Sequence, residues 1–215
     1  MKAVVLSAGQ GKRLLPLTEE NPKCLLAVRG DEPILGWQLA ALARAGIDRA
    51  VVVIGIGAER VEAWLAANPV PGLACETLIN PFYRSSDNLI SCWLARGAMS
   101  EDFLLLNGDT IFEDAVLART LEVSAPIALA IDHKQTYDDD DMKVSLDSRG
   151  RLLAIDKWLA RPVVGGESIG LLSFRGSGPK LFTTALEQAV RRPEAMRQWY
   201  LSVVHQIAQT TPVET

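Results

Sequence analysis

A short glycine loop followed by basic residues is the part of this sequence best suited to chemistry. Residues 7–11 read Ser-Ala-Gly-Gln-Gly and follow the apolar segment Ala3–Leu6, which has the pattern of a β-strand. The two glycines lack a Cβ atom, so the backbone can turn tightly and direct its N–H groups at an anion. Three basic residues follow the loop: Lys12, Arg13 and Lys23. The combination predicts a site that holds a nucleotide by its phosphates.

The spacing of the glycines excludes two other phosphate-binding loops. The P-loop has four residues between its glycines and a Ser or Thr after its lysine, whereas here one residue separates the glycines and Arg13 follows Lys12. The dinucleotide fingerprint needs a third glycine, where this chain has Leu14, and an acidic residue after the second strand, which here ends Ile-Gly-Ile-Gly at 54–57. A nicotinamide or flavin enzyme is therefore disfavoured. An ordinary strand-to-helix turn with surface cations remains the alternative.

Composition sets the class of protein. A chain of 215 residues that is 48% apolar can bury one sizeable core as a single domain. The net charge of −4 argues against a nucleic-acid partner. No apolar run approaches the ~18 residues of a membrane span, and the N-terminus lacks the pattern of a signal peptide. The three cysteines form no CxxC motif, which favours reduced thiols and a cytoplasmic location.

Strand and helix patterns alternate along the first 131 residues. Strands are expected at 3–6, 50–54, 73–79, 103–106 and 127–131, and helices from near 33, at 58–67, at 87–98 and at 114–122. Further on, a hairpin is expected at 142–146 and 152–155, a strand at 168–174, and helices at 181–190 and 199–207. These patterns predict a single-domain α/β fold, a Rossmann-like three-layer sandwich with a mostly parallel central sheet and a small β-hairpin region.

A longer pattern surrounds the loop. Residues 6–35 read LSAGQGKRLLPLTEENPKCLLAVRGDEPIL and resemble the signature of nucleotidyltransferases that activate sugar 1-phosphates and small phosphorylated alcohols. The chain departs from that signature by Ser7, where the family has Ala. Later segments, NPFYRSSDNLISCWLA, LNGDTIF, DDDDMKVSLDSRGRLLAIDK and GESIGLLSF, are most similar to the cytidylyltransferase branch, which acts on phosphocholine, inositol 1-phosphate or related compounds. The resemblance implies one nucleotidyltransferase domain over 1–215, with a nucleotide-binding half at about 1–110 and an acceptor-binding half at about 111–215.

The resemblance implies transfer of CMP from CTP to a phosphorylated acceptor, with release of pyrophosphate and Mg²⁺ as cofactor. Arg13 would hold the leaving pyrophosphate, Lys23 would bridge the α-phosphate and the acceptor phosphate, and Asp109 would bind the metal. A turn aspartate that caps the next helix is the alternative for Asp109. The family places a second metal carboxylate after a final C-terminal strand, which we expect this domain to lack.

Other site residues are expected from the same resemblance. The nucleotide would contact Leu6, Ala8, Gly9, Gln10, Gly11, Lys12, Arg13, Asn80, Ser86 and Asn88. The acceptor would contact Asp132, Asp141, Lys143, Lys157, Trp158 and Glu167. Helix capping competes as the role of Ser86, and a solvated loop competes as the reading of the acidic run 138–141.

Several alternatives stay open. The enzyme would instead use GTP, UTP or dTTP on a sugar 1-phosphate, or belong with the more distant molybdopterin-type nucleotidyltransferases. From a different class, the chain would be a catalytically impaired module that binds nucleotide without turnover. A homo-oligomer is also compatible with the sequence, since the apolar C-terminal segment needs a covering surface.

Overall fold

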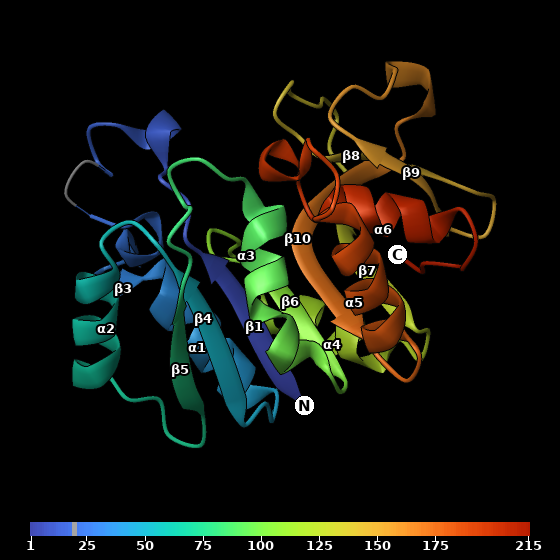
Figure 1. Cartoon of the computed structure of the whole chain (residues 1–215). Coiled ribbons are helices and arrows are strands. Elements are labelled where there is room, and N and C mark those ends of the chain that lie inside the picture. The colour runs from blue at the N-terminus through green and yellow to red at the C-terminus, as the bar shows by residue number, and fades with distance from the viewer. Residues whose placement is uncertain (19–20) are drawn as a thin grey trace.

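One twisted sheet organises the molecule (Figure 1). The computed structural model describes residues 1–18 and 21–215, and within them eight strands form a sheet in the order β5-β4-β1-β6-β10-β8-β9, with β7 also paired to β10. These strands are β1 (Lys2–Ser7), β4 (Arg49–Ile54), β5 (Ala74–Ile79), β6 (Phe103–Asn107), β7 (Ile127–Asp132), β8 (Lys143–Leu146), β9 (Leu152–Asp156) and β10 (Gly166–Phe174). A separate two-stranded ribbon pairs β2 (Ala27–Arg29) with β3 (Glu32–Pro33).

The direction of pairing changes at β10. Strands β5, β4, β1 and β6 are parallel, as the strand-helix alternation predicts. Strand β10 runs antiparallel to β6, to β7 and to β8, so it joins the parallel half of the sheet to the hairpin β8–β9. The aromatic rings of Phe103 on β6 and Phe174 on β10 stack at a centroid distance of 4.5 Å, which adds side-chain contact to this junction.

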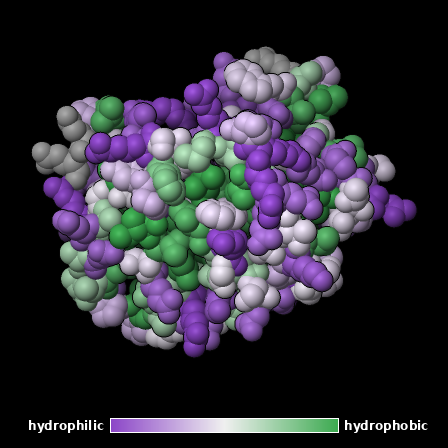
Figure 2. All heavy atoms as spheres, viewed as in Figure 1, coloured by the Kyte–Doolittle hydropathy of each residue, from purple (hydrophilic) through white to green (hydrophobic). Residues whose placement is uncertain are grey.

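Helices cover both faces of the sheet and give the expected three layers. They are α1 (Ile34–Arg44), α2 (Ala58–Ala67), α3 (Asn88–Leu94), α4 (Asp114–Glu122), α5 (Gly178–Ala189) and α6 (Leu201–Ala208). One core contains Leu39 of α1, Val61 of α2 and Leu117 of α4. The opposite core contains Leu89 of α3, Phe182 of α5 and Val204 of α6. Figure 2 shows this second face, where apolar side chains gather over its middle and hydrophilic ones surround them.

The helix that follows β5 changes type along its length, which the sequence did not predict. The helix expected at 87–98 is α-helical only to Leu94 and continues as a 3-10 helix, Ala95–Met99, where Gly97 lowers the helical propensity.

The C-terminal helix is covered within the chain, because α6 packs on β9 and α5 and buries Leu201, Val203 and Ile207. The apolar C-terminal segment therefore needs no second copy to cover it. None of the described helices is long and apolar enough to cross a membrane.

An isolated β-bridge residue follows α6. After α6, Glu214 lies between β7 and the start of β9, donating its N–H to the carbonyl of Ile127 at 3.1 Å and accepting from the N–H of Leu129 at 2.9 Å. The described residues after α6 form no longer strand, and none of them lines the cleft described below.

Candidate active site

A cleft of about 720 Å³ lies at the carboxyl ends of β1 and β6. Ligands of open parallel sheets gather at this edge, because the loops that follow the strands converge there. Of the residues expected to contact nucleotide or metal, all line this cleft: Leu6, Ala8, Gly9, Gln10, Gly11, Lys12, Arg13, Lys23, Asn80, Ser86, Asn88 and Asp109. The three residues expected to carry the chemistry, Arg13, Lys23 and Asp109, therefore share one cavity.

The glycine loop is shaped by Gly11. Its φ of +60° is left-handed, and a Cβ there would lie 2.8 Å from Cγ2 of Thr18, so only glycine fits without strain. The Thr18 hydroxyl donates to the Gly11 carbonyl at 2.8 Å, and Gln10 Nε2 donates to the Tyr83 carbonyl at 3.1 Å. These bonds fix the loop at both sides, while Gly9 stays open to the cleft with no atom within 4 Å of a Cβ built on it.

The turn that carries Asp109 is held from three directions. Buried Gln38 of α1 donates to the carbonyls of Asn107 and Thr110, both at 2.8 Å. The Thr110 hydroxyl donates to the Ile169 carbonyl of β10 at 2.6 Å. The hydroxyl of Tyr200 donates to Asn107 Oδ1 at 3.2 Å. Asp109 thus occupies a preorganised turn.

Gly108 allows the end of β6 to approach β1. A Cβ at this position would lie 2.3 Å from Ser7 Oγ and 2.7 Å from the Leu6 carbonyl oxygen. Ser7, the one departure from the family signature, is buried at the cleft wall beside the thiol of Cys24. Burial raises the pKa of the neighbouring Cys24 thiol to about 11, which favours the protonated form at neutral pH.

Lys23 and Asp109 contact each other directly. The Lys23 ammonium donates to Asp109 Oδ2, and both side chains are partly exposed to the cleft. The Asp109 carboxylate therefore pairs with a cation in the free protein, and a metal ion would bind to the same carboxylate. The described residues contain no group of three His, Cys, Asp or Glu side chains placed to hold a metal by themselves.

The three polar residues on the other wall serve the fold as well as the cleft. The Asn80 side chain donates to Ser91 Oγ at 3.0 Å and accepts from the N–H of Phe82 at 2.8 Å. The Ser86 hydroxyl donates to the Phe82 carbonyl at 2.9 Å, and α3 has no side-chain capping hydrogen bond, so Ser86 does not cap this helix as the alternative reading expected. Asn88 Oδ1 accepts from the N–H of Tyr200 at 3.0 Å. The base-contact prediction for these residues stays a prediction.

The structure divides the expected acceptor residues into two groups. Asp141, Lys157 and Glu167 line the cleft. Asp132, Lys143 and Trp158 do not, and this part of the sequence prediction has no geometric support.

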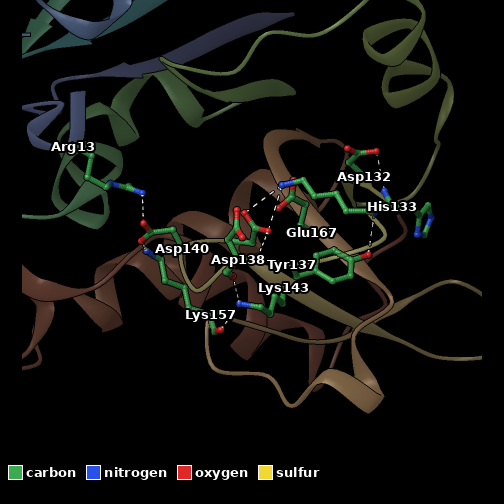
Figure 3. Close-up of polar contacts among 11 residues, drawn as sticks. Arg13, Asp132, His133, Tyr137, Asp138, Asp140, Lys143, Lys157 and Glu167 are labelled. Atoms are coloured by element: carbon green, nitrogen blue, oxygen red, sulfur yellow. Dashed lines mark hydrogen bonds and ion pairs between the residues drawn. The ribbon is translucent and has the colours of Figure 1, made fainter. Parts of the chain in front are cut away.

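Each of the three has another place in the fold. Asp132 Oδ1 accepts from the N–H of the next residue at the exposed end of β7. The buried Lys143 ammonium donates to the carbonyls of Asp138 at 2.5 Å and Lys157 at 2.8 Å (Figure 3). Trp158 follows the end of β9 and is 77% exposed.

Two carboxylates on the acceptor side share one ammonium. Lys134 Nζ lies 2.5 Å from Glu167 Oε1 and 3.3 Å from Asp141 Oδ1. Burial, together with the adjacent Asp141, raises the pKa of Glu167 above its usual range. Burial would also raise the pKa of Asp141, but the hydrogen bond from the Asp138 N–H, the interaction with the Glu167 side chain and the Lys134 ammonium bring it below its usual range. The sequence analysis did not identify Lys134 as a site residue, because no motif or spacing distinguishes it from other lysines.

Asp140 was also missed, because the acidic run 138–141 has the composition of a solvated loop. Its Oδ2 lies 2.7 Å from Arg13 Nη1, and its Oδ1 lies 3.0 Å from Lys157 Nζ. Lys157 Nζ also lies 4.7 Å from the ring centroid of Trp199, a cation–π contact from the segment before α6. Asp140, Lys157 and Trp199 all line the cleft.

An α/β sandwich with a glycine loop of the phosphate-binding type at the edge of its sheet is typical of nucleotide-binding transferases. A family model described as a MobA-like NTP transferase domain matches residues 3–193, and the chain belongs to that family. This membership confirms the resemblance to nucleotidyltransferases read from the sequence.

Two individual relatives each match more than half of this chain. The CMP-5'-(3-aminopropyl)phosphonate synthase of Streptomyces rubellomurinus is 40% identical over 131 residues, which cover 61% of this chain and 20% of that protein. The bifunctional IPC transferase and DIPP synthase of Aquifex aeolicus is 35% identical over 121 residues, 56% of this chain and 27% of that protein. The chain therefore spans about a quarter or less of the length of these two relatives.

The fold is shared with a solved enzyme. The inositol-1-phosphate CTP transferase from T. maritima superposes with a TM-score of 0.79 at 19% identity, covering 99% of this chain and 83% of that one. The likeness confirms the α/β fold class expected from the sequence.

Proposed function

We propose that this chain transfers CMP from CTP to a small acceptor that ends in a phosphate or phosphonate group, with release of pyrophosphate. The observation that carries the proposal is the shared cleft, in which the glycine loop, Arg13, Lys23 and Asp109 face one cavity. The choice of CTP is supported by the relatives, one of which is named a CMP-phosphonate synthase and another a CTP transferase.

The reaction is an in-line displacement. An oxygen of the acceptor's phosphate forms a bond to the α-phosphorus, and the bond from that phosphorus to the bridging oxygen breaks as pyrophosphate departs with the electron pair. The protein must bring two anions together and stabilise the charge of the transition state. Backbone N–H groups of residues 8–11 and the fork of Arg13 suit the β- and γ-phosphates, and Lys23 suits the position between the two substrates.

Asp109 fits a magnesium ion. Its carboxylate is partly exposed to the cleft and already binds a cation, and Mg²⁺ prefers one or two carboxylates completed by phosphate oxygens and water. Such an ion would neutralise the triphosphate and stabilise the developing charge.

The acceptor side favours a cationic substrate. Asp141 and Glu167 present two carboxylates to the cleft and share the single positive charge of Lys134. An acceptor with an amino group would bring the second positive charge, whereas a neutral sugar or polyol would not. We therefore place aminoalkyl phosphonates and phosphates ahead of inositol 1-phosphate.

Pyrophosphate release tests the function. CTP, GTP, UTP and dTTP are each incubated with 3-aminopropylphosphonate, phosphocholine, inositol 1-phosphate or glucose 1-phosphate, with and without Mg²⁺. Release with CTP and an amino acceptor is expected. Release only with another triphosphate and glucose 1-phosphate would establish the sugar alternative, and nucleotide binding without release from any pair would establish a binding module.

Asp109→Asn tests the metal site within the same assay. The variant is expected to lose Mg²⁺-dependent release, while Asp31→Asn, which removes an exposed carboxylate that does not line the cleft, retains it. Near-normal release by Asp109→Asn would remove this residue from the mechanism.

A further inference from the structure

Asp140 bridges two cations that come from opposite walls of the cleft (Figure 3). Arg13 belongs to the 3-10 helix Lys12–Leu14 after β1, and Lys157 follows the end of β9. Each oxygen of the Asp140 carboxylate meets one of them, at 2.7 and 3.0 Å. The hydrogen bond from Lys157, followed by the charge of Arg13, holds the pKa of Asp140 below its usual range. Asp140 is therefore an anion at neutral pH.

The loop that carries Asp140 is fastened on either side of it. The Lys143 ammonium donates to the Asp138 carbonyl, and the Asp138 N–H donates to Asp141 Oδ2 at 2.8 Å. Lys157 is also held in place, since its Nζ lies against the ring of Trp199. The carboxylate therefore reaches the two cations from an anchored loop.

The contact is accessible and weak enough to be displaced. The side chains of Arg13 and Asp140 are 74% and 57% exposed, so water competes for both. Ion pairs this open to water contribute little to stability. A triphosphate or a phosphate monoester carries more charge than one carboxylate and presents several oxygens to the same cations, so it outcompetes Asp140.

We propose that Asp140 is an internal competitor of substrate phosphate. In the free protein its carboxylate occupies the anion position between Arg13 and Lys157, and a substrate anion must displace it to bind. This inference rests on the proposed function for the identity of that anion. The contact joins the nucleotide side of the cleft to the acceptor side, so displacement by either substrate also frees a cation for the other.

The test compares Asp140→Asn with Asp139→Asn by calorimetric titration. Both substitutions remove one exposed aspartate charge from the same loop, but Asp139 forms no ion pair among the described residues. Inorganic pyrophosphate without metal reports on the two cations alone, and CTP with Mg²⁺ reports on the nucleotide site.

Asp140→Asn is expected to bind pyrophosphate about three- to tenfold more tightly than Asp139→Asn, because the carboxylate that competes for Arg13 and Lys157 is removed. Affinities within twofold of each other, weaker binding by Asp140→Asn, or no pyrophosphate binding by either variant would overturn the proposal. If neither variant binds CTP while the pyrophosphate difference remains, the proposed function fails and the internal competitor stands.

Discussion

Replacing Lys23 by alanine tests whether this lysine contributes to catalysis or only to the stability of the fold. In the free protein its ammonium pairs with Asp109, but the two side chains are 32% and 42% exposed. A pair this open to water contributes at most about 1 kcal/mol to stability. For a chain of 215 residues, that loss lowers Tm by no more than about 2–4 °C.

The expected effect on turnover is larger. If Lys23 lies between the α-phosphate and the acceptor phosphate, its charge acts where negative charge is concentrated in the transition state. Removing one such preorganised contact lowers kcat by about 10²-fold or more, which corresponds to about 2.7 kcal/mol. The activation barrier therefore changes by more than the folding free energy does.

Pyrophosphate release over a range of CTP concentrations, with Tm from thermal unfolding, measures both quantities. Lys180→Ala is the matched control, because Lys180 is exposed on α5 and does not line the cleft. Equal kcat values for the two variants would refute the reasoning. A change confined to KM would limit Lys23 to substrate binding, and a Tm loss well above 4 °C would make the lysine structural.

Three further predictions concern the stability of the fold. Gly108→Ala is expected to lower the free energy of unfolding by about 1–3 kcal/mol, and adding Ser7→Ala should recover only part of this in urea titrations, since a backbone carbonyl also blocks the new Cβ. Lys143→Met should cost about 1–3 kcal/mol by the same titration, because two carbonyls lose their donor; an unchanged midpoint would contradict its structural role. Arg44 lowers the pKa of Asp114, so the stabilisation by Asp114 is present at neutral pH and is lost as pH falls below about 4. Asp114→Asn should therefore lower Tm at pH 7 but not near pH 2, and an equal Tm difference at both pH values would count against this ion pair.

Local patterns predicted most of the fold. The helices at 58–67 and 114–122 match α2 and α4, because apolar spacing and flanking residues define an isolated amphipathic helix. The antiparallel insertion of β10 between β6 and the hairpin lay beyond such reasoning. It depends on pairing between residues 65 to 71 positions apart, and a run of apolar residues does not indicate which strand it will pair with.

The convergence of residues at the cleft was predictable where these residues directly follow the strands of the parallel sheet. The glycine loop and the turn at Asp109 follow the ends of β1 and β6, so their convergence follows from the parallel sheet, whereas Lys23 lies in a 3-10 helix and was expected at the site only from the family signature. The acceptor side depends instead on hairpin register and loop path. Register turns Lys143 inward toward backbone carbonyls, and the chain leaves β9 with Trp158 facing solvent. The pairing of Asp140 with Arg13 spans 127 positions and has no counterpart in the local sequence.

Strand β10 has a consequence for how acceptors of different size are selected. It carries Glu167 at its start and pairs at Leu171 with Leu106, three residues before Asp109. Asp109, the proposed metal ligand, lies in the turn after β6, and Glu167, a proposed acceptor contact, lies on the neighbouring strand β10, so hydrogen-bonded backbone and not a hinge sets their separation. Longer or shorter acceptors must be accommodated by the connections at 133–142 and 157–165. Exchanging those two loops should change acceptor length preference while leaving nucleotide choice intact.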